Sequence, residues 1–109
     1  MSHTNNFWEK LSKPANTGRP FFVLAPMADV TDSVFRRLVV ETGQACLPAG
    51  RPDVMFTEFV AADGLMHPLG REHLLIDLKY SEIERPIVAQ IWGGKPDNIE
   101  GAAALVREL

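Results

Sequence analysis

The sequence has little of several features that would place it in a specialised class. Its single cysteine, Cys46, excludes an internal disulfide, so we expect a reducing compartment. The residues before Phe7 lack the charged and apolar regions of a signal peptide. An apolar run such as residues 21–28 is far shorter than the roughly 20 residues that a membrane-spanning helix needs. We therefore expect a soluble, cytoplasmic protein.

The chain also has no excess of basic residues. It carries 11 Lys and Arg against 14 Asp and Glu, which gives a net charge of -3. A surface that binds nucleic-acid phosphates normally leaves a basic excess. If RNA is a partner, its main binding surface is therefore not encoded in these 109 residues. A chain of this length forms one small domain at most.

What the sequence does have is a regular series of apolar runs. Three runs of strand length begin at Phe21, Val54 and Ile87, one every 33 residues. Uninterrupted apolar runs are typical of strands that are buried on both faces of a parallel sheet. The spacing is close to that of a βα unit, which takes roughly 30 residues. Since such connections are nearly always right-handed, we predict an α/β fold with parallel strands.

A helix with clear boundaries is predicted between the first two runs. Thr31 or Asp32 can cap its start, and Gly43 can close it in the left-handed conformation. Arg36 and Arg37 are expected on its solvated face. The other face is expected to pack against the sheet, and it carries Phe35, Leu38, Val39 and Thr42.

The remaining segments are less uniform. Pro96 suits the first position of a helix after the third run. Between the second and third runs, residues 60–66 predict a short helix, and the alternation over residues 74–80 predicts an extended segment. Residues 1–20 are predicted to be an irregular arm, in which Phe7, Trp8 and Leu11 have helical spacing.

The residues that follow the first run have the properties of a ligand site. In parallel α/β proteins, ligands bind at the carboxyl ends of the strands. Pro26 stiffens this turn, Met27 offers a polarizable contact to an aromatic face, and Ala28 lets a flat ring approach the backbone. Gln90, at the end of the third run, supplies a donor and an acceptor from one side chain. The polar edge of a flavin presents the carbonyl and N–H groups that such an amide can bind.

Three linked motifs resemble the tRNA-dihydrouridine synthase family. They are LAPMADVTD with FRRL (residues 24–32 and 35–38), TEFV (57–60) and RPIVAQIWG (85–93), in the order and spacing of that family. The resemblance covers residues 21–109 and implies an incomplete TIM (β/α)8 barrel, of which the chain holds about the first three βα units. In that family the barrel carries FMN, NADPH reduces the flavin, and the flavin delivers hydride to a uracil ring in tRNA. We expect about four or five further units beyond Leu109, followed by a helical domain that helps to hold tRNA.

The resemblance also implies roles for individual residues. Residues 26–28 correspond to the backbone cradle of the flavin ring, and Gln90 corresponds to the amide that binds its polar edge. Glu58 lies in a motif that helps to shape the uridine pocket. The family's general-acid cysteine follows a later strand in an Asn-x-x-Cys-Pro context, so no catalytic residue is assigned within this chain. Cys46, which we expect in a loop after the first helix, does not match it.

The sequence departs from the family beside this loop. Asp29 stands where many relatives have glycine, which places a carboxylate next to a cofactor that becomes anionic on reduction. Residues 46–52 also lengthen the approach to the second strand.

Other polar residues have simpler interpretations. Glu58 and Asp63 could form an acid–base pair, but carboxylates at this spacing more often begin a helix or face solvent. His67 and His73 do not share a helical face, so no metal site is expected. Residues 93–95, Gly-Gly-Lys, lack the Walker spacing and are expected to lead into a helix.

Two other functions stay open at this point. The chain could belong to another FMN barrel enzyme that acts on a free pyrimidine. It could also be a small interaction protein that derives from such a barrel and has no catalytic activity, because three strands leave an edge and apolar surface uncovered. For the isolated 109-residue chain we expect poor folding and no retained FMN.

Overall fold

The structure is a computed structural model that describes residues 6–12, 20–46 and 50–109. Most of the predicted arm, as well as residues 47–49 of the approach to the second strand, lies outside these ranges. The elements, in chain order, are α1 (Phe7–Ser12), β1 (Val23–Leu24), α2 (Ser33–Cys46), β2 (Val54–Ala61), α3 (Ala62–Met66), α4 (Pro68–Leu74), the 3-10 helices η1 (Leu75–Leu78) and η2 (Glu82–Glu84), β3 (Ile87–Trp92) and α5 (Pro96–Arg107).

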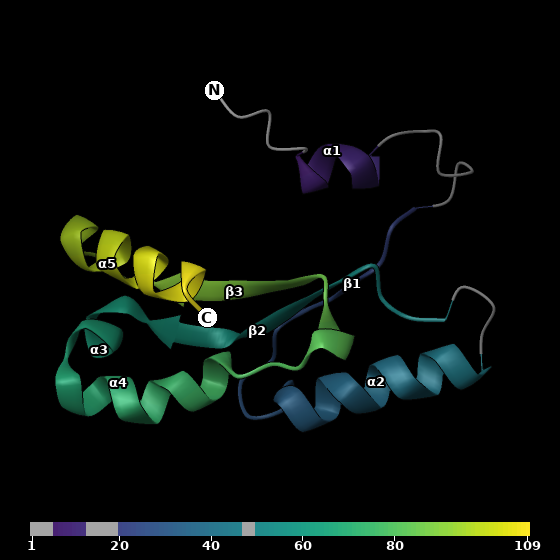
Figure 1. The fold of residues 1–109 in the computed structure, drawn as a ribbon, viewed down its shortest axis with the longest axis horizontal. Coiled ribbons are helices and arrows are strands. Elements are labelled where there is room, and N and C mark those ends of the chain that lie inside the picture. The colour runs from purple at the N-terminus through teal and green to yellow at the C-terminus, as the bar shows by residue number, and fades with distance from the viewer. Residues whose placement is uncertain (1–5, 13–19, 47–49) are drawn as a thin grey trace.

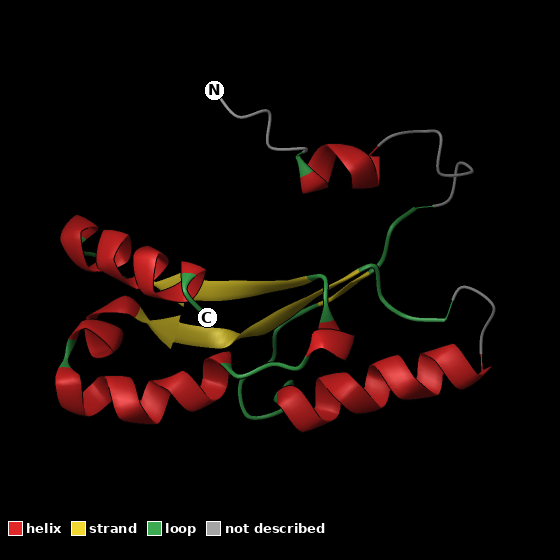
Figure 2. Cartoon of the chain, in the orientation of Figure 1, coloured by secondary structure: helices red, strands yellow, loops and turns green. Residues whose placement is uncertain are grey.

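The three strands form one parallel sheet in the order β1-β2-β3 (Figure 1). Helices α2 and α4 lie on one side of the sheet (Figure 2), and α5 packs against β3 and α3. The buried centre lies between β2, β3 and the helices that follow them, and it consists of Val60, Ala62, Leu65, Leu78 and Ala102. The predicted α/β fold with parallel strands is therefore confirmed.

The first strand is shorter than predicted. We expected it to cover residues 21–25, whereas β1 contains only Val23 and Leu24. Before the strand, the N–H of Phe22 donates to the side chain of Asp53 at 2.7 Å, so a carboxylate takes the place of a ladder carbonyl. After the strand, Pro26 has no N–H to donate. Pairing with β2 is therefore regular only over two residues.

Helix α2 differs from its prediction in its end and in its buried face. Asp32 caps its start as expected, because Oδ1 accepts the N–H of Phe35 at 2.8 Å. However, Gly43 does not close the helix, which continues to Cys46, so this cysteine is helical and not in a loop. Arg36 and Val40 are the fully buried side chains of α2, whereas Leu38, expected on the packed face, is 58% exposed.

The position of Gly43 inside the helix requires glycine, because another stretch of backbone approaches it closely. A methyl group at this position would overlap the carbonyl oxygen of Gly50. We expect Gly43→Ala to lower the free energy of unfolding by about 1–3 kcal/mol, because the overlap outweighs the gain in helix propensity. Urea unfolding measures this change. Gly94→Ala is the matched control, since Gly94 has open space around it, and it should change stability by less than about 0.5 kcal/mol.

The second crossover is mostly helical up to Leu78, and the backbone of Lys79 and Ser81 beyond it is extended. Strand β2 continues to Ala61, so the predicted helix begins two residues late, at Ala62, and ends at Met66 as expected. The prediction of an extended segment over residues 74–80 was wrong up to Leu78, because α4 runs to Leu74 and η1 follows directly. Leu78 is buried and Ile76 is exposed, whereas in a strand these two side chains would lie on the same face.

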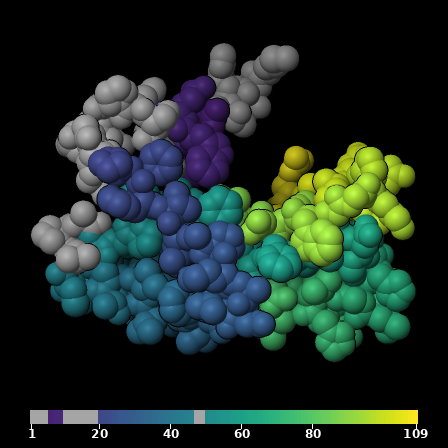
Figure 3. Space-filling view, turned by 180° about the vertical axis from the view of Figure 1, so that it is seen from behind, coloured from purple at the N-terminus to yellow at the C-terminus, as the bar shows by residue number. Residues whose placement is uncertain are grey.

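Large apolar side chains in and around the strands remain exposed. Seen from behind, residues from the N-terminal third (blue) and from the later strands (teal and lime green) reach the surface together (Figure 3). Phe59 and Trp92 lie edge to face, with ring centroids 6.5 Å apart. The exposed apolar residues of these segments are Phe21, Phe22, Val23, Met27, Phe59 and Trp92. Within the described ranges, no helix is long and apolar enough to cross a membrane.

Candidate functional site

The loop after β1 is a tight turn that is closed by its own hydrogen bonds. The carbonyl of Met27 accepts the N–H groups of Val30 at 3.1 Å and Thr31 at 3.0 Å. In return, the hydroxyl of Thr31 accepts the N–H of Met27 at 2.9 Å. The backbone of Met27 is thus used inside the turn, while the residue as a whole is 43% exposed. Pro26 is half-buried and Ala28 is exposed, so this turn offers a ligand the Met27 thioether and the surface around Ala28.

Asp29 occupies the strained position of this turn. Its φ is 61°, in the left-handed region where glycine is favoured and where aspartate is one of the few other residues tolerated. Its N–H donates to Oε1 of Glu58 on β2. The predicted departure from glycine is therefore accommodated, and the turn is attached to the neighbouring strand through its backbone.

A bulge in β2 places Glu58 in this position. Phe56 pairs with Val88 and Phe59 pairs with Gln90, so two residues of β2 face one of β3. Bulges of this kind redirect side chains and are frequent beside active sites. The hydroxyl of Thr57 replaces the missing ladder carbonyl, since it accepts the N–H of Gln90 at 3.1 Å.

Gln90 carries an unusual polar atom. Its Oε1 is buried and accepts no hydrogen bond from the described residues. A buried carbonyl without a donor costs about 1–3 kcal/mol, so such atoms are rare unless a ligand completes them. This side chain was predicted from the sequence to bind a polar edge, and its oxygen has the unmet hydrogen-bonding capacity that such a role needs.

The site residues predicted from the sequence are connected across three strands, but they do not line one cavity. The turn meets β2 at Glu58, and β2 meets Gln90 through Thr57. Glu58 lines an open pocket of about 410 Å³, together with Asp29, Asp32, Ser33, Val34, Ile76, Asp77 and Lys79. Despite these carboxylates, the described part of the chain contains no group of His, Cys, Asp and Glu that could hold a metal ion.

Asp63 and the Gly-Gly-Lys segment have the simpler roles expected from the sequence. Asp63 lies in the first turn of α3, where its carboxylate accepts a hydrogen bond from Asn98 at 2.7 Å. Lys95 precedes α5, whose first residue is Pro96 as predicted.

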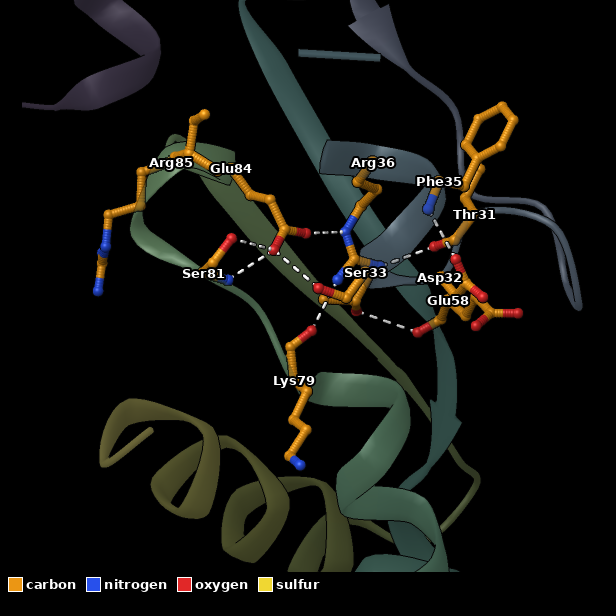
Figure 4. A network of polar contacts seen from close by, with 12 residues as sticks. Thr31, Asp32, Ser33, Phe35, Arg36, Glu58, Lys79, Ser81, Glu84 and Arg85 are labelled. Carbon is orange, nitrogen blue, oxygen red and sulfur yellow. Dashed lines mark hydrogen bonds and ion pairs between the residues drawn. The ribbon is translucent and has the colours of Figure 1, made fainter. Parts of the chain in front are cut away.

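A buried ion pair behind the turn was missed by the sequence analysis. Arg36, which we expected in solvent, is fully buried, and its Nε lies 2.6 Å from Oε1 of the equally buried Glu84 (Figure 4). Its Nη1 donates to the carbonyl of Thr31 and its Nη2 to that of Lys79, both at 2.7 Å. The sequence contains a signal for Glu84 but not for Arg36, because Ser81 and Glu84 form the S-x-x-E pattern of a capping box.

Glu84 is held in its charged form. Burial by itself would raise its pKa, but a set of hydrogen bonds outweighs burial and lowers the pKa below its ordinary value of 4.5. The backbone N–H of Ser81 donates to Oε2 at 2.5 Å, Arg36 donates to Oε1, and the hydroxyls of Ser33 and Ser81 each donate to Oε2 at 2.9 Å. The carboxylate therefore joins the start of α2 to the segment before β3.

This lowered pKa predicts how stability depends on pH. The folded protein binds the Glu84 proton less tightly than the unfolded chain does, so the contribution of Glu84 is complete above about pH 4.5 and is lost as the pH falls further. We expect Glu84→Gln to be less stable than the wild type at pH 7, with a shallower loss between pH 5 and pH 3. Urea unfolding between pH 7 and pH 3 measures both effects of Glu84→Gln. Glu41→Gln, which replaces an exposed glutamate, is the control. Parallel pH curves for wild type and Glu84→Gln would contradict the assignment.

Comparison with known proteins identifies the family. The model of the dihydrouridine synthase (Dus) family matches residues 23–109, which is most of the chain. The chain belongs to the dihydrouridine synthase family. It is 48% identical over 106 residues to the probable tRNA-dihydrouridine synthase 2 of Bacillus subtilis, an alignment that covers 97% of this chain and 29% of that protein. It is 49% identical over 92 residues to the probable tRNA-dihydrouridine synthase of Staphylococcus aureus strain COL, with 84% of this chain and 24% of that protein covered.

The resemblance seen in the motifs is thus confirmed, and the partial barrel agrees with the family's fold. The chain spans about a quarter of the length of these dihydrouridine synthase relatives. The roles of Pro26, Met27, Ala28, Gln90 and Glu58 are not tested by the comparisons and stay predictions.

Proposed function

We propose that this chain is the N-terminal part of an FMN-dependent tRNA-dihydrouridine synthase, which uses NADPH to reduce uridine in tRNA to 5,6-dihydrouridine in the cytoplasm. Family membership supports the reaction, and both relatives, which are probable tRNA-dihydrouridine synthases, support tRNA as the substrate. The net charge of -3 agrees with a tRNA-binding surface that lies mainly outside these residues.

The observation that carries the cofactor assignment is the unsatisfied Oε1 of Gln90. An N–H group of a ligand would complete it, and the polar edge of FMN carries one. The exposed thioether of Met27 adds a soft surface suited to an aromatic ring. The residues present therefore fit FMN.

Each of these residues has a separate task in the proposed enzyme. When bound, FMN supplies the hydride chemistry. Gln90 would fix the orientation of the ring, and residues 26–28 would support it. Glu58 would shape the adjoining uridine pocket, because it already lines an open pocket beside the turn. The proton donor is expected outside residues 1–109, so this chain supplies binding and orientation.

Deletion of the complete gene tests the proposal. Dihydrouridine should fall in one or more tRNA species, as measured by mass spectrometry of purified tRNA, and should return when the intact gene is supplied on a plasmid. An unchanged dihydrouridine content in a strain without other genes of this family would contradict the tRNA assignment. It would instead favour an enzyme that acts on a free pyrimidine, provided that the purified protein carries FMN.

A further inference from the structure

We propose that Arg36 is a positioning residue that sets the conformation of the turn at residues 26–31, and through it the affinity for FMN. This inference rests on the proposed function, because it assigns the turn to the flavin site. Of Arg36 and its hydrogen-bond partners, only Lys79 lines the open pocket at Glu58, and none contacts the side chain of Gln90 in the hydrogen bonds described above.

The guanidinium group of Arg36 holds three segments of the chain together. Its three nitrogens donate in three directions: Nε to Glu84, Nη1 to the carbonyl of Thr31 and Nη2 to the carbonyl of Lys79. These partners belong to three separate segments, namely the segment before β3, the turn after β1 and the end of η1. The guanidinium plane thus fixes the carbonyl of Thr31 relative to two segments that are remote in sequence.

Thr31 in turn holds Met27 of the turn at residues 26–31. Thr31 is fully buried, and its hydroxyl accepts the N–H of Met27 at 2.9 Å and lies 3.2 Å from the carbonyl of the same residue. Its own N–H donates to that carbonyl at 3.0 Å. Thr31 therefore connects Arg36 to Met27 through hydrogen bonds, so that a displacement of Thr31 would also move Met27.

Arginine at position 36 provides contacts that a lysine could not. A lysine at position 36 could keep the charge opposite Glu84, but its ammonium group lacks the planar arrangement of donors that reaches two carbonyls at once. A buried ion pair alone contributes little net stability, since desolvation offsets much of the attraction. The specific contribution of arginine here is the additional pair of bonds to Thr31 and Lys79.

The test compares Arg36→Lys with Arg37→Lys in the complete gene product. Arg37 is the matched control, because it is the next residue of the same helix, its side chain is 54% exposed, and it forms a surface ion pair with Glu41 at 4.0 Å. We expect Arg36→Lys to fold, to raise the Kd for FMN about tenfold and to shift the visible flavin spectrum. Amide hydrogen exchange of residues 27–31 in the FMN-free protein should accelerate, while that of the peptide covering β3 should not.

The outcomes separate a positioning role from a merely structural one. A folded Arg36→Lys with unchanged Kd, spectrum and exchange overturns the proposal, even if its melting temperature falls. If Arg36→Lys does not fold, Thr31→Val decides the matter, because it removes the hydroxyl that holds Met27 and leaves the carbonyl that Arg36 binds. The proposal then requires the same rise in Kd. A wild-type protein that binds no FMN overturns the proposed function, and hydrogen exchange still decides whether Arg36 orders the turn.

Discussion

Arg36→Met in the complete gene product is expected to lower the free energy of unfolding by about 3–5 kcal/mol. The substitution leaves the carboxylate of Glu84 buried without its ion-pair partner, and it also removes the donors to the carbonyls of Thr31 and Lys79. Buried charges and carbonyls that lose their partners are costly because water does not replace them. Equilibrium unfolding in urea at pH 7 measures the loss.

Two further variants show whether the ion pair is the cause. Arg37→Met removes an exposed arginine from the same helix and should change stability by less than about 0.5 kcal/mol. The double variant Arg36→Met/Glu84→Leu removes both charges, so it should be more stable than Arg36→Met alone. If the double variant is less stable than the single one, the unpaired charge of Glu84 is not the source of the loss.

Gln90→Met is expected to act in opposite directions on stability and on binding. Without FMN, the variant should be more stable than the wild type by about 1 kcal/mol, because it removes a buried carbonyl oxygen that accepts no hydrogen bond from the described part of the chain. Its Kd for FMN should rise about tenfold, because the N–H group of the ring then loses its acceptor. Thermal unfolding of the FMN-free protein and quenching of flavin fluorescence measure the two effects.

The opposite signs distinguish a cofactor ligand from a packing residue. A residue that only packs would lose stability when it is replaced and would leave the Kd for FMN unchanged. Gln44→Met is the matched control, since Gln44 is an exposed amide on α2, and it should alter neither quantity. A variant at Gln90 that destabilises the FMN-free protein and binds FMN normally would remove the main support for the cofactor assignment.

The parts of the fold that local patterns determine were predictable. The apolar runs at Val54 and Ile87 begin β2 and β3 at the expected residues, and Asp32 caps α2 as predicted. Their causes lie within a few residues of sequence. Gly43 and Leu78 were misinterpreted because their surroundings come from elsewhere in the chain, from the backbone of Gly50 in one case and from β2 in the other.

The same distinction between local and distant causes applies to the residues of the candidate site. The Pro26–Ala28 turn and Gln90 could be selected because their chemistry is visible in the sequence itself. Arg36 could not, since an arginine beside Arg37 on a helix is normally solvated. Its burial depends on Glu84, 48 residues later, and on the carbonyls that converge on the same guanidinium group. The bulge at Thr57 was likewise invisible, because a hydroxyl there substitutes for a backbone acceptor.

The uncovered aromatic side chains at Phe59 and Trp92 have a consequence for biosynthesis. Ribosomes add about 5–20 residues per second, so synthesis of the proposed enzyme, several times longer than this segment, would continue for seconds after β3 has left the ribosome. During that interval the open edge of β3 and the neighbouring aromatic rings face solvent. We therefore expect the nascent chain at this stage to bind chaperones that recognise apolar segments, and its yield in cells to depend on them.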